Sequence, residues 1–588
     1  MQEVKKKLLL IKGNDKYPII NYLLLFAFLV LISVITTFKL FQDDDVFWHL
    51  ATGRYIIQNG QIPSSDVFGF ISGGMKWIPF EWGWDVITFM IYSIGGFYAL
   101  SVFRTVIVLS IFFIIILILR KQNLSFSVII PFSILLIFGI LTRLSIRPQI
   151  ATYFFLILII YIFFRHKYNN TGEKKFLFLM PSIFLIWANI HMGVLTGILI
   201  FALYCISELI ETFIINRKNI SEELIRKIKF LVITFIISAA VLLINPNFIN
   251  TYIYTFKHSQ MDLLEQINEW KSPFSSSNIY YYNVIIYLFF LITGLVIFYY
   301  SFRKKELFPV LVYIVIGIYS IQAMRFITDF MITIFIFWMI SISFLTSKFN
   351  FDKVIENIIS KTIIFIGIIY LIFNIYNNTI YKEYLGNYFR ETGFGVNENF
   401  FPKKMFDFIT KENIDKIGSR PFNNLKIGGY FIWNFPENKN FIDSRNLNDS
   451  LYYLYKNIDL KKYGFELLLE KLNVDYVIYS TPYLIYNPGE IEKNIISYLA
   501  EENNKWKLVY WDDRSFLFVK NIPKFKDIIS QFEYKFVSPY NFLFEQKTLN
   551  EKYISDRLAV TGELRRKLIE EPDGKIINDI AENFKKVY

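Results

Sequence analysis

The sequence predicts an α-helical polytopic membrane protein that carries an α/β domain at its C-terminal end. Of the 588 residues, 54% are hydrophobic and only 19% are charged, a balance typical of chains that cross a membrane many times. Long apolar runs continue as far as residue 377, and none follows it. We therefore expect a membrane domain over residues 1–377, an external α/β domain over 378–522 and a helical C-terminal tail over 523–588.

Eleven apolar runs have the scale of about 20 residues that a helix needs to cross the hydrocarbon core. A shorter run over 82–95 stops at Gly95 and Gly96 after about 14 residues, so we interpret it as an interfacial helix. The basic N-terminus precedes a run without a small-residue cleavage site, which predicts an uncleaved first span. The expected spans lie near residues 18–40, 97–119, 125–141, 149–164, 176–190, 194–215, 230–244, 283–300, 307–322, 327–346 and 362–377.

The basic residues of the loops indicate how the chain crosses the membrane. With the N-terminus in the cytoplasm, about 22 Lys and Arg lie in the cytoplasmic loops and about 7 in the opposite ones, a strong positive-inside bias. We therefore expect a multi-pass protein of the cell (cytoplasmic or inner) membrane with an extracytoplasmic C-terminal domain. Because the basic residues share no single face, the net charge of +12 does not indicate a nucleic-acid partner. The basic loops are 5–7, 120–121, 165–175, 217–229, 303–305 and 348–361.

Conspicuous polar residues fall in the loops assigned to the external side, so we expect any chemistry to take place there. The cytoplasmic loops hold only basic residues and ordinary polar ones. The polar external loops are 41–85, 141–149, 187–193, 245–273 and 322–329.

The C-terminal part reads as alternating short elements. Residues 403–414 (KKMFDFITKENI) have the spacing of a helix, and three runs rich in β-branched and aromatic residues predict strands. These runs are 473–480, 506–511 and 515–520. Helical stretches between the strands favour a small α/β domain.

The first external loop, 41–96, holds the densest set of candidate residues, and we expect it to be catalytic. Asp43, Asp44 and Asp45 begin a segment with helical spacing of apolar residues, and Asp45 shares one helix face with His49 four residues on. A carboxylate beside an imidazole at a membrane surface suits proton transfer. The alternative is a capped helix start with an interfacial aromatic belt. Asp66 and Glu81 are further candidate substrate-binding residues of this loop.

Other external loops supply candidate binding groups. Arg143 and Arg147 flank a span end, where guanidinium groups suit a phosphate or carboxylate; an ion pair with Asp43 or Asp66, or a lipid headgroup contact, is the alternative. Glu269 and Trp270 pair a carboxylate with a stacking surface, although an interfacial Trp anchor explains them equally well.

Two more candidates lie at external span ends. His191 has either a packing role or a substrate contact. Arg325 precedes Asp329 by four residues, so we expect a salt bridge to engage Asp329 and leave Arg325 more open to a ligand.

Several common sites are absent from the sequence. There is no phosphate-binding loop, no G-x-G-x-x-G after a strand and no H-E-x-x-H. The four histidines and the single cysteine, Cys205 in an apolar run, make a His or Cys metal site improbable. The Gly428-Gly429 pair indicates a turn. We therefore expect no His- or Cys-based metal site. A divalent metal cofactor such as Mg²⁺ or Mn²⁺ stays open but is not favoured.

Several motifs along nearly the whole chain resemble a widespread group of bacterial polytopic proteins that is placed among glycosyltransferases of the GT-C fold. These motifs are DDDVFWHLATGRYIIQNGQIPSSDVF, EWGWD, RPQ, WANIHMG, NPN, INEW, GGYFIW and FIDSR. The first is distantly similar to E-x-D-P-W-F-N-Y-R-A-T-R-Y of oligosaccharyltransferase catalytic subunits: Asp43 falls at its Glu, Asp45 at its catalytic Asp, and Arg54 and Tyr55 at its Arg-Tyr.

The resemblance implies a GT-C-like membrane domain of about 11 helices and a glycosyltransferase that transfers a hexosyl or pentosyl group. The donor would be a polyprenyl-phosphate-linked sugar, and the acceptor an extracytoplasmic glycan, glycolipid or protein. Asp45 would be the carboxylate that engages the acceptor nucleophile or a metal, with Asp43 supporting it. Arg143, Arg147, His191 and Arg325 would stabilise the leaving phosphate.

Two departures from the oligosaccharyltransferase pattern narrow this expectation. The second external loop lacks an acidic pair, and the C-terminal part has no W-W-D-Y-G run. A metal-independent enzyme that acts on a glycolipid or polymer, rather than on an asparagine sequon, is the better interpretation.

Two other function classes stay open. A lipid or glycolipid transporter or flippase would carry charges in the middle of its spans and repeat symmetry between its halves. A non-catalytic envelope-assembly protein would use the external domain to bind a partner.

Overall fold

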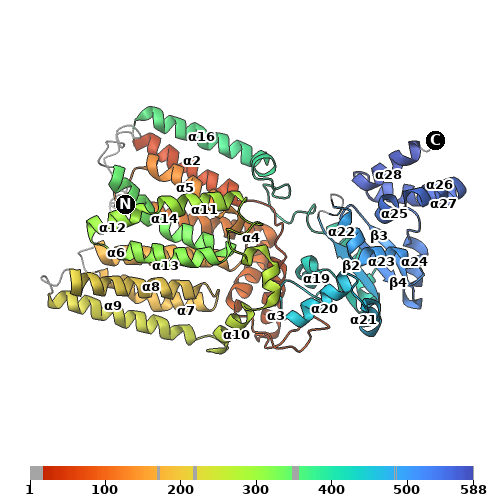
Figure 1. Ribbon diagram of the computed structural model, residues 1–588, viewed down its shortest axis with the longest axis horizontal. Helices are drawn as coiled ribbons and strands as arrows, with labels where there is room; N and C mark the ends of the chain where they lie inside the picture. Colours follow the sequence, from red (N-terminus) through yellow and green to blue (C-terminus); the bar gives the residue numbers. More distant parts are fainter. Residues whose placement is uncertain are drawn as a thin grey trace. The chain divides into compact units, whose positions relative to one another are not determined.

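The structure, a computed structural model, describes residues 18–168, 173–215, 221–346, 357–482, 484, 487–502 and 504–586 (Figure 1). It comprises two compact units, each built from two stretches of chain. The helical unit contains Met1–Leu40 and Phe80–Gly395. The second unit contains Phe41–Pro79 and Val396–Tyr588, and we call it the external unit after its predicted side of the membrane. The first external loop thus packs with the C-terminal residues, which its sequence position does not indicate.

The helical unit is made of long apolar helices. In the described part of the chain, eight helical segments are long and apolar enough to cross a membrane. They contain α2 (Pro18–Thr36), α4 (Trp82–Lys121), α5 (Phe126–Ile140), α6 (Gln149–Tyr168), α8 (Val194–Ile210), α11 and α12 (Tyr282–Thr293 and Val296–Lys304), α14 (Ile327–Thr346) and α16 (Ile358–Tyr376). The predicted class, a polytopic helical membrane protein, is confirmed.

Three of the expected spans fall on helices that do not reach that length or apolarity. They are α7 (Met180–Ala188), α9 (Glu222–Ala240) and α13 (Phe308–Gln322). The first turns of α9 carry acidic and basic residues, which shorten its apolar part. One further helix, α10 (Asn250–His258), lies in a loop that the sequence analysis assigns to the external side.

Helix α4 contains the predicted break. Gly95 and Gly96 leave the helical conformation, with φ of −158° and 59°. At Gly96, the φ of 59° and ψ of −150° fall in a region that is essentially restricted to glycine. Residues 82–94 therefore form a helical segment of their own before the longer apolar one. Its interfacial position stays a prediction.

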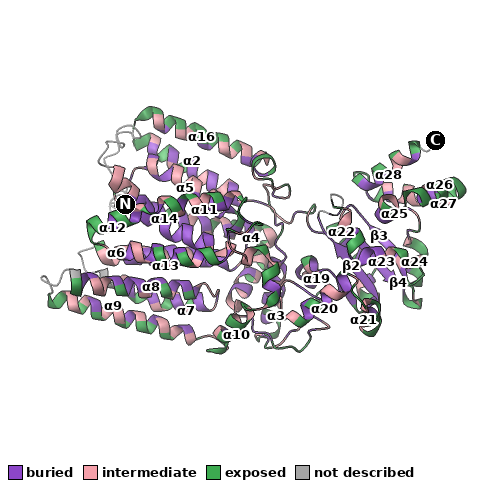
Figure 2. Ribbon diagram, in the orientation of Figure 1, coloured by how far each residue is buried: buried purple, intermediate pink, exposed green. Residues whose placement is uncertain are grey.

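Helix α14 is the centre of the helical unit. Its residues from Ile327 to Ser341 are all buried (Figure 2), and it packs against α4, α5, α6, α11, α12 and α13. A helix that is apolar on every face is stable only when it is covered all round. The Trp338 indole donates a hydrogen bond to Thr293 Oγ1 at 3.0 Å, so its polar edge is also satisfied.

The external unit has a four-stranded sheet in the order β1-β2-β4-β3. The strands are β1 (Pro421–Asn423), β2 (Tyr476–Ser480), β3 (Trp506–Trp511) and β4 (Ser515–Lys520). The pair β1–β2 is parallel and the other pairs are antiparallel. The three predicted strands are confirmed. The sequence analysis missed β1, because three residues are too few to show a period.

Helices cover and extend this sheet. They are α3 (Asp45–Asn59), α17 (Lys403–Lys411), α18 (Ile414–Ile417), α19 (Gly428–Asn434), α20 (Asp449–Asp459), α21 (Phe465–Lys471), α22 (Gly489–Lys493), α23 (Ile495–Glu501), α24 (Lys526–Phe532), α25 (Pro539–Phe544), α26 (Gln546–Ser555), α27 (Arg557–Glu570) and α28 (Lys575–Lys586). The last five form the tail, which is helical as predicted.

Part of the charge argument falls on residues beyond those described. The basic residues at 5–7, and the stretches 169–172, 216–220 and 347–356 of other basic loops, lie outside the described residues. The membrane orientation therefore stays a prediction.

Candidate functional site

Polar loops of the helical unit are tied together around Asn189. The Gly83 N–H donates to the Asn189 carbonyl at 3.0 Å, and the Trp82 indole donates to Asn189 Oδ1 at 3.0 Å. The Asn189 amide in turn donates to the Ile244 carbonyl at 3.0 Å. A Cβ on Gly83 would lie 2.5 Å from the Asn189 carbonyl oxygen, so the close approach of these two backbones requires glycine. The EWGWD and WANIHMG motifs are therefore neighbours.

The INEW loop is held against the loop that carries Arg325. The Asn278 amide donates to the carbonyls of Asn268 and Ser272 at 2.9 and 3.1 Å, which closes the loop on itself. The Met324 N–H donates to the Lys271 carbonyl at 2.8 Å. These bonds fix the backbone on both sides of the candidate residues.

Arg143 and Glu269 form the closest ion pair of this group. Arg143 ends the 3₁₀ turn η2 (Leu141–Arg143) and is buried, and its Nη1 lies 2.7 Å from Glu269 Oε2. Arg147 Nη1 lies 4.0 Å from the same oxygen. The charge of Arg143 outweighs burial and, with Arg147, lowers the pKa of Glu269 to about 2. Glu269 is thus a carboxylate at neutral pH and holds both arginines in place.

Arg325 lies over the ring of Trp270. Its guanidinium carbon is 4.3 Å from the ring centre, a cation–π geometry. The ion pairs of the described residues include none between Arg325 and Asp329, so the expected salt bridge is wrong. Arg325 belongs to the 3₁₀ turn η9 (Met324–Phe326), before α14 begins, and the i,i+4 spacing of an α-helix does not apply there.

His191 is oriented by a chain of hydrogen bonds. The Trp187 indole donates to Thr152 Oγ1 at 3.0 Å, and Thr152 Oγ1 lies 2.7 Å from His191 Nδ1. The Gly193 N–H also points to Nδ1, at 3.1 Å. Because Nδ1 accepts from both groups, the ring proton belongs on Nε2. Nε2 lies 3.6 Å from Glu81 Oε1, so the imidazole presents an N–H on the side of Glu81.

His191 is expected to stay neutral in mildly acidic solution. Burial, together with the positive charges of Arg325 and Arg143, lowers its pKa to about 3. The unfolded chain therefore binds the extra proton first, and this group's contribution to stability is lost as pH falls from about 6.5 towards 3. NMR of ¹³C-labelled histidine in the detergent-solubilised protein, assigned with His191→Gln, should show no titration of His191 between pH 5 and 8. A midpoint near 6.5 would contradict this electrostatic account.

The external unit uses Asp44 for its own structure. One carboxylate oxygen accepts the Gly429 N–H at 2.7 Å and the other accepts the Tyr430 N–H at 2.8 Å, and Ser444 Oγ donates at 3.2 Å. The carboxylate thus meets the unpaired N–H groups at the start of α19. Burial raises the pKa of Asp44 well above its usual value, although the two backbone hydrogen bonds act in the opposite direction.

The GGYFIW glycines are explained by this contact. A Cβ on Gly429 would lie 2.4 Å from the Asp44 carbonyl oxygen and 2.8 Å from its carboxylate. The turn expected at Gly428-Gly429 is in fact the start of a helix that approaches Asp44 closely. The sequence contains the DDD and GGYFIW motifs but does not indicate that Asp44 and Gly429 are in contact.

Asp45 differs from its two neighbours in exposure. It is the first residue of α3, is partly exposed, and accepts a hydrogen bond from the Trp48 indole at 3.3 Å. Asp43 and His49 are 3% and 2% exposed, and the His49 ring lies beside Trp48 with centroids 3.7 Å apart. Of the three consecutive carboxylates, Asp45 is therefore the one most accessible to a substrate.

Asp66 is enclosed by internal partners. Its oxygens accept the N–H groups of Phe68 and Gly69, both at 3.0 Å, and the Ser72 hydroxyl at 2.5 Å. Arg445 Nη1 lies 2.7 Å away. Burial works against ionisation, yet Arg445 and these hydrogen bonds hold the pKa of Asp66 below its usual value. The carboxylate holds the loop together, and a substrate contact for it stays a prediction.

The FIDSR motif supplies the other half of this network. Arg445 donates from Nε and Nη2 to the two oxygens of Asp443, at 2.8 and 2.7 Å, a bidentate pair. The guanidinium also lies 4.6 Å from the ring centre of Trp77. Arg445 thus joins the first loop to the C-terminal part. The sequence analysis includes Arg445 in the FIDSR motif but not among the candidate site residues, because spacing along the sequence does not reveal a partner, Asp66, that lies 379 residues away.

The candidates therefore fall into two groups that the structure describes separately. The helical unit brings together Arg143, Arg147, Glu269, Trp270 and Arg325, and pairs Glu81 with His191. The external unit contains Asp43, Asp45, His49 and Asp66. A single cavity that both groups line stays a prediction. Within the described ranges, no group of three or more His, Cys, Asp or Glu is arranged to hold a metal ion.

Comparisons with known proteins establish the fold. No protein-family model matches the chain, and no curated protein matches its sequence. The oligosaccharyltransferase of Archaeoglobus fulgidus in its apo form has a similar structure, with a TM-score of 0.55 and 12% identity over 86% of this chain and 75% of that one. ArnT from Cupriavidus metallidurans bound to undecaprenyl phosphate gives a TM-score of 0.48 and 9% identity over 87% of this chain and 99% of that one, too low a score for inference. The chain therefore shares its GT-C fold with the oligosaccharyltransferase, and at such identity the likeness extends to the fold alone.

Proposed function

We propose that this protein is a GT-C glycosyltransferase that moves a hexosyl or pentosyl group from a polyprenyl-phosphate-linked donor to an extracytoplasmic glycan, glycolipid or protein acceptor. It would act in the cell membrane, with the N-terminus in the cytoplasm. The fold supports the class of enzyme. The observation that carries the proposal is the guanidinium of Arg325, which is stacked on Trp270 beside the Arg143–Glu269 pair.

This arrangement suits the phosphate of a lipid-linked donor. Arg325 is oriented by the ring beneath it, so its planar set of N–H donors is available to phosphate oxygens. Glu269 holds Arg143 at 2.7 Å and Arg147 at 4.0 Å, which keeps two more guanidinium groups in the same loop cluster. The neutral His191 adds an N–H donor near Glu81. Such donors stabilise the negative charge that grows on the leaving phosphate.

Asp45 is the proposed catalytic carboxylate. As the acceptor hydroxyl attacks the anomeric carbon, its proton passes to Asp45, the new glycosidic bond forms, and the bond to the phosphate oxygen breaks. The polyprenyl phosphate leaves with the electron pair, and attack from the opposite side inverts the anomeric carbon. Asp43 would support Asp45. His49 and Asp66, which belong to the same unit, would contact the substrate.

Loss of the gene tests the proposed class directly. Mass spectrometry of envelope glycans and polyprenyl-phosphate sugars in a deletion strain should show one glycan missing a sugar and one lipid-linked sugar in excess. The accumulated lipid would identify the donor. Unchanged glycans and lipid-linked sugars would contradict a transferase. If the protein were a flippase, its lipid would accumulate in the wrong leaflet of the deletion strain, and the solubilised protein would transfer no sugar.

Arg325→Ala is expected to reduce transfer by about 10²–10³-fold, the usual cost of removing one preorganised donor to a developing anion. The transfer rate of Arg325→Lys should lie between those of the wild type and Arg325→Ala, because lysine keeps the charge but loses the planar set of donors. Transfer would be measured with the detergent-solubilised full chain and the donor identified above. The control is Arg226→Ala, at an exposed position of α9. Equal rates for the Arg325→Ala variant and the control would remove Arg325 from the site.

A further inference from the structure

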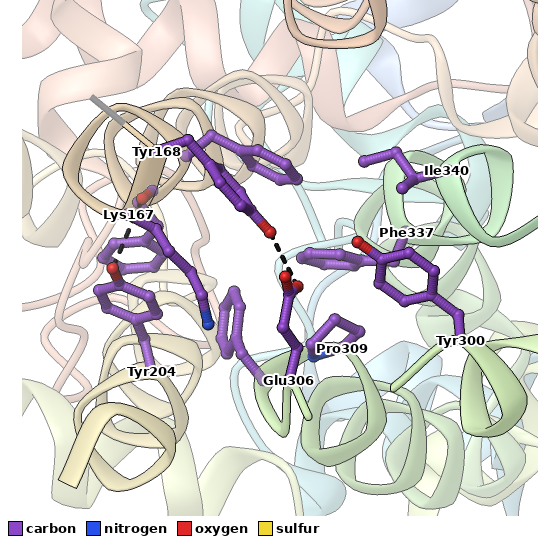
Figure 3. A pocket seen from close by; sticks show the side chains of 11 residues that line it. Lys167, Tyr168, Tyr204, Tyr300, Glu306, Pro309, Phe337 and Ile340 are labelled. Carbon is purple, nitrogen blue, oxygen red and sulfur yellow. Dashed lines mark hydrogen bonds between the residues drawn. The ribbon is translucent and has the colours of Figure 1, made fainter. Parts of the chain in front are cut away.

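A second polar group lies at the other end of the helical unit, where α6, α12 and α14 approach their C-terminal ends and α13 begins. A small cavity is lined there by aromatic and charged side chains (Figure 3). Tyr168 ends α6 and Tyr300 lies near the end of α12, so the cavity is at the level where these candidate spans stop. The lining residues are Phe163, Phe164, Lys167, Tyr168, Tyr204, Tyr300, Glu306, Phe308, Pro309, Phe337 and Ile340.

The aromatic lining is not an ordinary interfacial belt. Belt residues of a membrane protein sit at the membrane–water interface with their rings among the headgroups. Here Tyr204 is fully buried and Tyr300 is 8% exposed, so both lie inside the unit. Tyr204 stacks on Phe163 and packs against Phe308. The rings therefore form walls whose faces carry the negative part of the aromatic quadrupole.

Glu306 brings a carboxylate into this space. Figure 3 shows it among the rings with the Tyr168 hydroxyl directed at it, and that hydroxyl donates to Glu306 Oε2 at 2.8 Å. Tyr300 lines the same cavity. Among the described residues Glu306 forms no ion pair within 4.0 Å, although Arg303, Lys304 and Lys305 precede it in the chain.

The nearby Lys167 is shared among several carboxylates and forms its ion pairs with two others. Lys167 Nζ lies 2.8 Å from Glu211 Oε2 and 3.3 Å from Glu208 Oε1, so two other carboxylates already compete for its charge. Glu211 also accepts the Leu307 N–H at 2.6 Å, which fixes the turn before α13. The wall of the cavity thus carries a negative charge that a positive ligand would complement.

The size of the cavity restricts that ligand. Its volume of about 20 Å³ suits one water-sized group, since a water needs roughly 10–15 Å³ by the same measure. A primary ammonium group has that size and three N–H donors, whereas a trimethylammonium group is several times larger. Carboxylate and hydroxyl oxygens next to aromatic faces are the environment in which an ammonium is bound.

We propose that this cavity binds the primary ammonium of a phospholipid headgroup of the ethanolamine type. The position at the span ends favours a lipid over a soluble amine, because acyl chains lie alongside the spans and the headgroup lies at the level of Tyr168, which is 44% exposed. Arg303 and Lys304 end α12 and Lys305 follows it, and these basic side chains suit the lipid phosphate. The site is separate from the residues assigned to sugar transfer and does not depend on that assignment.

Native mass spectrometry of the purified full chain in detergent tests this site. Phosphatidylethanolamine, phosphatidylcholine and phosphatidylglycerol with identical acyl chains would be titrated in turn. We expect the ethanolamine lipid to bind about tenfold more tightly than the other two, which is the effect of one charge-assisted hydrogen bond. Equal binding of the three lipids would overturn the proposal, and so would equal binding of glycerophosphoethanolamine, which has no acyl chains.

Two variants connect the preference to the cavity. Glu306→Gln keeps the side-chain shape and removes the charge, so the preference should fall to within about twofold. Ile340→Phe fills the space without changing any charge and should have the same effect, which covers the case in which Glu306→Gln does not fold. The matched control is Glu223→Gln on α9, whose side chain is 71% exposed. A preference retained by both cavity variants would assign the ligand to another surface.

Discussion

Asp45→Asn is expected to lower sugar transfer by about 10³-fold, within the range that a positioned general base supplies, while the protein stays folded. Asparagine has nearly the same shape but cannot accept the proton of the acceptor hydroxyl. Asp45 is partly exposed, whereas the neighbouring Asp44 is buried and accepts two backbone N–H groups, so we expect less of the fold to depend on the charge of Asp45. The measurement is the rate of transfer by the solubilised full chain, with thermal unfolding recorded on the same sample.

Asp44→Asn provides the contrast one residue earlier. Its carboxylate accepts two backbone N–H groups and the Ser444 hydroxyl inside the external unit. An amide nitrogen facing an N–H would leave a buried donor unsatisfied, at a cost of about 1–3 kcal/mol. We expect lower stability for Asp44→Asn and unchanged stability for Asp45→Asn. If Asp45→Asn kept full activity, the alignment of Asp45 with the catalytic Asp of oligosaccharyltransferases would be wrong.

Arg445→Ala is expected to destabilise the external unit by about 3–5 kcal/mol, the usual cost of breaking a buried ion pair from one side. The change leaves Asp66 and Asp443 facing each other without a cation, although their side chains are 0% and 4% exposed. It also removes the guanidinium that lies against Trp77. Limited proteolysis of the full chain in increasing urea measures the effect, since cleavage sites of the two units can be distinguished.

The control for this change is Arg420→Ala in the same unit. The Arg420 side chain is exposed, donates to the Leu472 carbonyl at 3.1 Å and lies 5.9 Å from the ring centre of Phe70, so its loss should cost well under 1 kcal/mol. The pKa of Asp66 is held below its usual value, so its contribution to stability is present above about pH 4 and is lost as the pH falls further. In the Arg445→Ala variant, this loss of stability below about pH 4 should disappear. An unchanged urea midpoint for Arg445→Ala would show that the network contributes no stability.

The sequence alone determined the helical scaffold. Length and apolar composition decide whether a helix can cross a membrane, and both are local properties of the chain. The break at Gly95-Gly96 and the three longer strands were predicted for the same reason, since each rests on residues within one short window. The sequence also selected the loops that hold Arg143, Glu269, His191 and Arg325.

Only the tertiary structure decided which of these residues are partners. The pairing of Arg143 with Glu269 and of Arg325 with Trp270 joins loops that lie far apart in the chain, and side-chain spacing along the sequence has no information on such contacts. The expected Arg325–Asp329 bridge failed because a 3₁₀ turn precedes α14. In the same way, the roles of Asp44 and Arg445 became visible only when the first loop was seen to pack with residues near 430 and 443. Local periodicity specifies elements, whereas long-range packing specifies which buried charges meet.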